Sequence, residues 1–214
     1  VAIGVGSRGI TNISTIVKAV VGYWQSVGAK PFIFPAMGSH GAATAAGQAD
    51  VLAHYGITEA TMGCPVISQL EVVSLGKDEN GIEAFLDKEA YNADGVMLVG
   101  RVKWHTDFAG KIESGLFKMM AIGLGKFSGA QRYHTYAYSL GSLERVIRSV
   151  GRQVLGTGKI LGGLAILEDA FHHTAQVTAV PVENMEKQEE ELLELVKSWM
   201  PRVPFDLDFL MIDE

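Results

Sequence analysis

Short apolar runs alternate with longer amphipathic stretches along most of this chain. The apolar runs at 1–5, 32–34, 95–99, 160–167 and 176–180 predict β-strands. Helical spacing of apolar residues predicts helices over 12–28, 142–155 and 184–200, and a further helix rich in small residues ends at Gly56. Strands that alternate with helices are typical of α/β proteins. We therefore expect a Rossmann-like, mostly parallel sheet with helices on both faces.

One pair of strands is expected to form a separate unit. The runs at 71–75 and 82–86 flank a turn that contains Asn80-Gly81. This dipeptide is a strong signal for a β-hairpin, because both of its residues accept the positive φ that the tightest hairpin turns require. The sequence thus predicts a small antiparallel excursion from the main sheet.

The composition and the chain ends bear on the domain organisation. The 214 residues are 48% hydrophobic and 20% charged, which is enough to bury a large core. We expect a single domain over 1–214. The first strand begins at residue 1, and 208–214 again predicts a strand that breaks off after Ile212. We therefore expect a fragment of a longer protein.

Charge and cysteine content narrow the possible partners and the compartment. The net charge is −6 and no basic stripe is present, so we expect no nucleic-acid partner. Helix N-termini can still hold small anions. The single cysteine, Cys64, excludes a disulfide within the chain and favours a reducing compartment. No apolar run approaches the roughly 20 residues that span a bilayer, so we expect a cytoplasmic protein without membrane contact.

Three glycine-rich turns follow predicted strands, and ligands of open α/β sheets bind outside the carboxyl ends of the strands. The first turn, from Gly4 to Gly9, matches G-x-G-x-x-G. A dinucleotide site also needs an acidic residue about 20 residues later, and 29–35 contains none, which disfavours a conventional NAD site. The turn presents Arg8, which is either a clamp for a substrate carboxylate or an ordinary surface arginine.

Two histidines lie at such strand ends. His40 stands where a helix begins, and a helix N-terminus favours the neutral ring that can accept a proton. His105 follows the strand at 95–99, with Asp107 close enough in sequence to orient its ring. Each is either a buried structural histidine or one of a pair that moves protons on opposite faces of a stereocentre. The remaining candidates, His54, His172 and His173, are interpreted as structural or surface residues.

The stretch 103–134 is too apolar for a solvated loop and also carries lysines, histidines and glycines. Lys118 is flanked by Leu116, Phe117, Met119 and Met120 on a helix that Ser114 is predicted to cap and Gly123 to end. Desolvation there lowers the pKa of a lysine and leaves an amine that can attack a carbonyl carbon. In the alternative interpretation, the aliphatic stem of Lys118 covers apolar surface and its charged amine reaches water. His134 is a candidate metal ligand, because imidazole suits zinc, copper, iron and nickel. No H-E-x-x-H or cysteine cluster supports a zinc site made of protein ligands alone.

Long motifs in this chain resemble the N-terminal domain of the nickel-pincer lactate racemase family. They are MGSHGAAT, VKWHTDFAGKIESGLFKMMAIGLGK with the following His134, and LAILEDAFHHTAQVTAVPVENME. The resemblance implies a nickel-pincer nucleotide joined covalently to Lys118, with His134, sixteen residues later, as a nickel ligand. It also implies catalytic roles for His40 and His105, substrate binding by Arg8 and a second domain beyond Glu214.

The resemblance implies a racemase or epimerase of a lactate-like 2-hydroxy acid. In that reaction one histidine takes the hydroxyl proton while hydride leaves Cα for the cofactor, and hydride then returns to the other face. The implied partners are the 2-hydroxy acid and the biosynthetic proteins that build the pincer cofactor. Two alternatives stay open: a nucleotide- or phosphate-dependent α/β enzyme that has lost the cofactor, and a non-enzymatic module that binds small anions or nucleotides.

Overall fold

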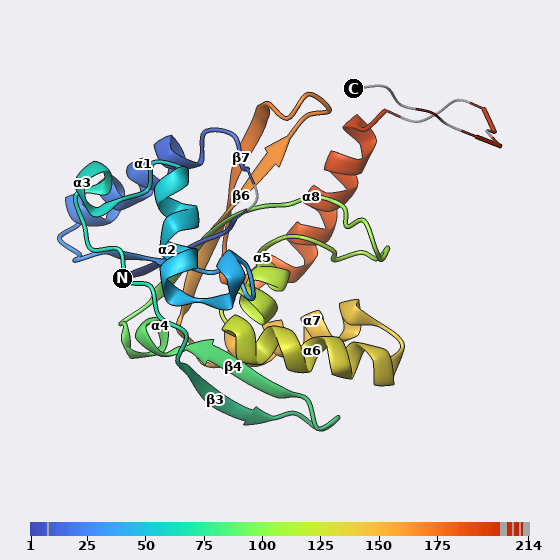
Figure 1. Ribbon diagram of the computed structural model, residues 1–214, viewed down its shortest axis with the longest axis horizontal. Helices are drawn as coiled ribbons and strands as arrows, with labels where there is room; N and C mark the ends of the chain where they lie inside the picture. Colours follow the sequence, from blue (N-terminus) through green and yellow to red (C-terminus); the bar gives the residue numbers. More distant parts are fainter. Residues whose placement is uncertain (8, 202–204, 207, 210, 212–214) are drawn as a thin grey trace.

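A computed structural model of the protein describes residues 1–7, 9–201, 205–206, 208–209 and 211. Its principal elements follow one another from the N-terminus to α8 (Figure 1): β1 (Ala2–Val5), α1 (Ile13–Ser26), β2 (Phe32–Pro35), α2 (Ala45–His54), α3 (Glu59–Met62), β3 (Val72–Lys77), β4 (Glu83–Asp87), α4 (Lys88–Asn92), β5 (Val96–Arg101), α5 (Leu116–Lys118), α6 (Lys126–Leu140), α7 (Leu143–Gly156), β6 (Ile160–Glu168), β7 (Thr174–Val180) and α8 (Met185–Trp199). Three short helical turns complete them: η1 (Gly41–Ala43), the π-helical turn η2 (Met119–Gly123) and η3 (Val182–Asn184).

The main sheet has five strands in the order β2-β1-β5-β6-β7. Its first four strands run parallel, and β7 returns antiparallel to β6 at the edge. The register places Val5 beside Pro35 on one side and beside Val99 on the other, so the carboxyl ends of these three strands meet. The predicted α/β fold with a mostly parallel sheet is confirmed.

The sheet separates two hydrophobic cores because side chains alternate between its faces. Ile3 and Val5 of β1 belong to the core that contains Val17 and Val21 of α1. Ala2 of the same strand belongs to the core built with α5, α7 and α8. Helices therefore cover both faces, as Figure 1 shows with α1 and α3 on one side and α8 on the other.

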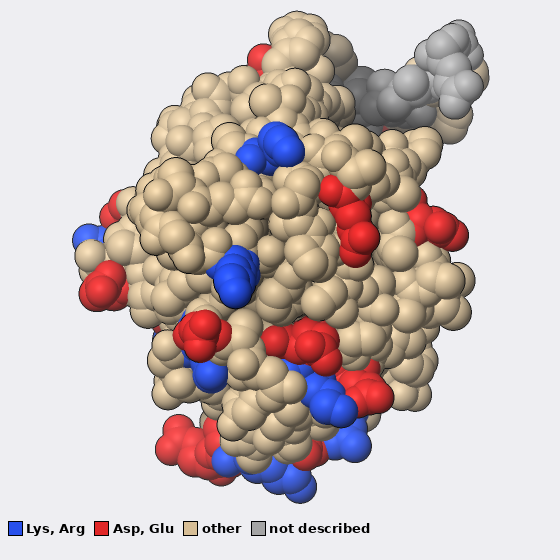
Figure 2. Space-filling model, turned by 90° about the vertical axis from the view of Figure 1, so that its left-hand side faces the viewer, with Lys and Arg blue, Asp and Glu red and all other residues tan. Residues whose placement is uncertain are grey.

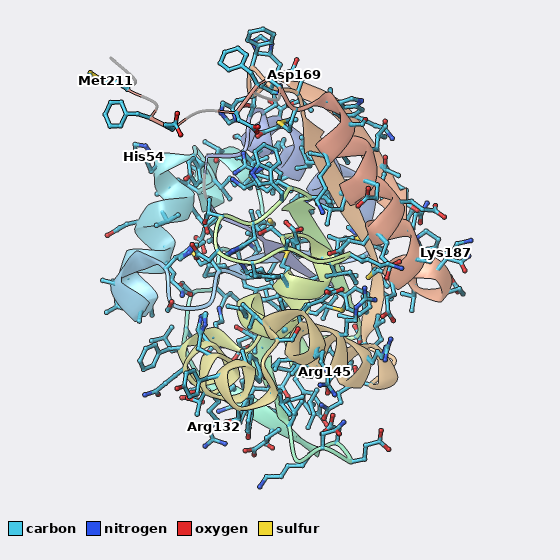
Figure 3. The ribbon with its side chains drawn as sticks, turned by 90° about the vertical axis from the view of Figure 1, so that its right-hand side faces the viewer. His54, Arg132, Arg145, Asp169, Lys187 and Met211 are labelled. Carbon is cyan, nitrogen blue, oxygen red and sulfur yellow. The ribbon has the colours of Figure 1, made fainter. Side chains whose placement is uncertain are left out.

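The expected hairpin is β3-β4, an antiparallel pair apart from the main sheet. The Asp78 carboxylate accepts hydrogen bonds from the amides of Asn80 and Ile82, and Gly81 has a φ of 77°. Arg132 of α6 lies on the hairpin side of the molecule (Figure 3), forms an ion pair with Glu83 and stands 4.9 Å from the Phe85 ring centre. The hairpin is thus attached to α6 rather than free.

Some local expectations need correction. Ser114 does not cap a helix, because its backbone pairs with Lys103 in an antiparallel bridge and Gly115 occupies the cap position instead. The expectation for Gly123 is right, because the helical stretch that carries Lys118 ends there with η2, and the separate helix α6 begins at Lys126. The strand expected over 208–214 falls largely outside the described residues, and the described ones there form no strand. Among the described residues, no helix is long and apolar enough to cross a bilayer.

Candidate functional site

A cavity of about 280 Å³ lies at the carboxyl ends of β1, β2 and β5. His40, His105, Lys118 and His134 all line it. These residues come from four different segments, and the position agrees with the general rule for ligand sites in open α/β sheets. The remaining predicted site residue, Arg8, lies outside the described residues.

His40 sits in a turn held by neutral polar groups. Its Nδ1 is hydrogen-bonded to the Ser7 hydroxyl, which follows β1. The buried Gln48 amide donates to the carbonyls of Gly38 at 2.8 Å and His40 at 3.3 Å. A side chain at Gly41 would overlap the backbone of the following helix, because its Cβ would lie 2.5 Å from a Gly47 backbone atom. Close backbone approach therefore fixes this turn.

The expectation that His40 begins a regular helix is only partly right. His40 precedes the 3₁₀ turn η1, whereas the regular helix α2 begins after Thr44, whose hydroxyl accepts a hydrogen bond from Gly47. The first residue of α2, Ala45, therefore comes five residues after His40. His40 thus stands at the start of η1, and the turn that carries it packs against the first turn of α2.

His105 belongs to a loop closed on itself, which we call the His105 loop (residues 103–114). Lys103 and Ser114 exchange two backbone hydrogen bonds of 2.8 and 3.1 Å at its base. Inside the loop, the buried Glu113 carboxylate accepts from the amides of His105 at 2.5 Å and Gly110 at 2.9 Å. Lys197 of α8 stands 2.9 Å from the same carboxylate. These hydrogen bonds lower the pKa of Glu113 against the opposing effect of burial.

Asp107 orients the His105 ring, but mainly through its backbone. The Asp107 amide donates to His105 Nδ1 at 3.1 Å, whereas its carboxylate stands 3.9 Å from that nitrogen and is largely exposed. The Phe108 ring packs against His105 with ring centres 4.5 Å apart, and the Lys118 amine lies 5.7 Å from the centre of the same ring. Phe108 therefore connects two of the candidate functional groups.

Lys118 lies on the short helix α5, whose start is held by a buried carboxylate. Glu189 of α8 accepts a hydrogen bond of 2.9 Å from the Phe117 amide. A Cβ at Gly115 would lie 2.3 Å from Glu189 Oε1, so glycine is needed there. Burial raises the pKa of Glu189 to about 7. Although 184–200 is rich in glutamate, which is typical of a solvated helix face, Glu189 is buried and only 1% exposed.

His134 reaches the cavity from α6. A continuous helix would place residues sixteen positions apart about 24 Å from each other. Here the π-helical turn η2 and a break before Lys126, which has a φ of 53°, separate α5 from α6. The break lets Lys118 and the exposed His134 line one cavity.

The break at Lys126 is stabilised by a buried ion pair. The Lys126 amine lies 3.0 Å from Asp87, at the end of β4, and donates at 2.5 Å to the Pro35 carbonyl. Both side chains are almost fully buried. Burial lowers the pKa of Lys126, and the Asp87 charge opposes that effect. No feature of the local pattern distinguishes this lysine from a surface lysine.

Two further cations line the cavity that the sequence did not single out. Arg101, the last residue of β5, is paired with the buried Glu168, which also accepts from the Thr11 amide at 2.7 Å. Lys103 lines the same cavity. Arg101 and Lys103 lie at, or just after, the carboxyl end of a buried strand, and this position was the sequence feature that could have identified them. By contrast, His54, at the end of α2 (Figure 3), is exposed, as are the side chains of His172 and His173.

The donor groups of the described residues limit how this cavity could hold a metal. No group of three or more His, Cys, Asp or Glu side chains there could bind an ion. His134 offers one imidazole and Lys118 one amine to the cavity. Among the described residues, the cavity thus offers single donor groups rather than a complete set of protein ligands, which fits a metal whose other ligands come from a bound cofactor.

Charge on the surface is mixed where it can be seen. On the face in Figure 2, Lys and Arg side chains are interspersed with Asp and Glu side chains, and neither sign forms a stripe.

Comparisons with known proteins support the fold assignment. No family model and no curated protein matches the chain. The structure is similar to that of the lactate racemase apoprotein from Thermoanaerobacterium thermosaccharolyticum, with a TM-score of 0.66 and 15% sequence identity. The similarity covers 89% of this chain and 48% of that chain, so this chain spans about half the length of that racemase. At this identity the similarity shows a shared fold.

Proposed function

We propose that this chain is the cofactor-bearing, catalytic part of a racemase or epimerase that acts on a 2-hydroxy acid. The observation that carries the proposal is the joint lining of one cavity by His40, His105, Lys118 and His134. Similarity in fold to a lactate racemase apoprotein supports the same reaction class. This chain spans about half the length of that racemase, so the activity is proposed for the whole protein.

In this proposal Lys118 and His134 hold a nickel-pincer nucleotide. Lys118 would hold the nucleotide through its amine, and the His134 imidazole would serve as a nickel ligand. The bound cofactor supplies a centre that accepts and returns hydride. Lys118 lines the cavity from α5, with its amine 5.7 Å from the centre of the Phe108 ring, whereas the adjacent Leu116 and Phe117 side chains are fully buried.

The two histidines move protons in this proposal. Racemisation of a 2-hydroxy acid removes the hydroxyl proton as Cα loses hydride, and a proton returns to the same oxygen when hydride comes back on the other face. His40 and His105 enter the cavity from two separate strand ends. A cation is needed for the substrate carboxylate, and we assign this role to Arg8. Arg101 and Lys103, which line the cavity, add further positive charge.

The test is intact-protein mass spectrometry with metal analysis, after coexpression with the biosynthetic proteins of the pincer cofactor. We expect a covalent adduct that maps to Lys118, together with about one nickel per chain. Lys118→Ala should abolish the adduct. Lys103→Ala is the matched control, because it removes another lysine from the same cavity and should leave the adduct in place.

Two results would contradict the proposal. One is an unmodified, nickel-free protein beside a control racemase that loads under the same conditions. The other is full racemisation of 2-hydroxy acids by the Lys118→Ala variant. Either result would favour an enzyme or binding module without the pincer cofactor.

A further inference from the structure

The two candidate catalytic histidines differ in the group that meets Nδ1. At His105 this group is a backbone N–H, which can only donate, so Nδ1 must carry a lone pair. A neutral imidazole has one protonated nitrogen, and the proton must therefore reside on Nε2. At His40 the partner is the Ser7 hydroxyl, which donates or accepts and is compatible with either tautomer.

The geometry that imposes this difference is built into the His105 loop. The donor, the Asp107 amide, follows the ring by two residues, so its direction depends on the backbone between them. Glu113 ties that backbone on both sides of Asp107, through the amides of His105 and Gly110. The Lys103–Ser114 bridge closes the base of the loop.

Glu113 is in turn held from outside the loop. Its carboxylate is 1% exposed and stands 2.9 Å from the Lys197 amine of α8. The same amine donates at 3.1 Å to the Gly110 carbonyl. A buried carboxylate with this many donors is a rigid anchor, because each displacement would leave a buried polar group without a partner.

We propose that Glu113 is a positioning residue that fixes His105 as the Nε2–H tautomer. Neutral His105 then offers a hydrogen-bond donor to a substrate oxygen. With its proton on Nδ1, toward Ser7, His40 can accept the hydroxyl proton at Nε2. The catalytic meaning rests on the proposed racemase function, whereas the tautomer itself is a property of the protein without cofactor.

The tautomer can be measured directly by NMR on the ¹⁵N-labelled chain without cofactor. At a pH where the rings are neutral, long-range ¹H–¹⁵N spectra distinguish protonated from unprotonated ring nitrogens, with His105→Gln to assign the signals. We expect His105 to show an unprotonated Nδ1 and a scalar coupling across the hydrogen bond to the Asp107 amide nitrogen. A protonated Nδ1 at His105 would overturn the inference, whatever the cofactor experiment shows.

Glu113→Gln tests the positioning role. The glutamine oxygen can accept from only part of the donor set of Glu113, and its NH₂ group would face the remaining donors. We therefore expect both tautomers of His105 and loss of the coupling to the Asp107 amide nitrogen. Glu144→Gln is the matched control, because Glu144 accepts from the amides of Lys111 and Ile112 on the other limb of the loop, at 3.2 and 3.3 Å. This variant should keep the single tautomer.

A second variant keeps the test decisive if Glu113→Gln does not fold. Glu113→Asp retains the charge beside Lys197 but withdraws the carboxylate by one methylene, so the coupling should weaken. An unchanged coupling in the folded variants would show that Glu113 does not position the ring. In the loaded enzyme, Glu113→Gln should lower kcat by roughly tenfold with little change in KM, since alignment for proton transfer is lost rather than substrate binding.

Discussion

Two parts of the cavity wall are held in place by different kinds of interaction. The turn that carries His40 (residues 38–41) is stabilised by neutral groups, namely the Gln48 amide and the Ser7 hydroxyl. The helical segment that carries Lys118 (residues 115–126) has a buried charged residue at each end, with Glu189 at its start and the Lys126–Asp87 pair at its finish. The two parts of the cavity wall should therefore respond differently to mutation and pH.

The physical reason is the cost of burying charge. A neutral hydrogen bond contributes modestly to stability, whereas a buried charge that loses its partner is strongly destabilising. The helical segment should therefore show the large and pH-dependent effects, and the His40 turn the small and pH-independent ones.

The largest effect is expected from Asp87→Ala. This change leaves the Lys126 amine buried without its counterion and should lower the free energy of unfolding by about 3–5 kcal/mol, as measured by urea denaturation. The double variant Asp87→Leu with Lys126→Met removes both charges and should recover most of the loss. A single variant with wild-type stability would mean that the ion pair does not hold the break between α5 and α6.

A pH-dependent effect is expected at Glu189. Its pKa is about 7 in the folded chain and 4.5 when unperturbed, so between these values the folded state holds a proton that the unfolded state has released. Stability should therefore fall as the pH rises through this window, by up to about 3 kcal/mol. Glu189→Gln should remove this pH dependence and be more stable than the wild type above pH 7.

Thermal unfolding between pH 4.5 and 8 provides the measurement for this contrast. The matched control is Glu191→Gln on the same helix, where the carboxylate is 63% exposed and pairs with Lys187. That control should follow the wild-type curve. An equal response of both variants would place the pH dependence elsewhere in the chain.

The smallest effect in the series is expected at the His40 turn. Gln48→Ala removes two hydrogen bonds to buried or half-buried carbonyls and should cost about 1–2 kcal/mol, without a change in pH dependence. Gln25→Ala, which removes an exposed hydrogen bond to the Gly63 carbonyl, should cost less. If Gln48→Ala proved as costly as Asp87→Ala, the division into a neutral and a charged part would be wrong.

Much of the fold could be predicted because it depends on local patterns. The apolar runs of β1, β5 and β6 and the Asn80-Gly81 turn placed the strands and the hairpin within a few residues of their observed bounds. The sequence alone did not predict the division of 114–140 into α5, η2 and α6. That division depends on Lys126, whose partner Asp87 comes from a distant part of the chain.

The same distinction between local patterns and long-range contacts applies to the candidate site. His40, His105, Lys118 and His134 could be selected from the sequence, since strand ends, a lysine in an apolar stretch and family-like motifs are visible there. The groups that orient these four residues could not be selected from the sequence. Glu113, Glu189 and Lys126 look like ordinary surface charges in the sequence. Asp107 was expected to orient the His105 ring, but the sequence did not indicate that its backbone amide would do so.

The sequence by itself determined the order of elements, the α/β class and the residue types that reach the strand ends, because periodicity and turn chemistry act over a few residues. Only the tertiary structure decided which charges are buried, which nitrogen of His105 meets a donor, and that two residues on different helices share one cavity. These properties depend on contacts between distant segments, such as Phe117 with Glu189, and no local pattern encodes such pairs.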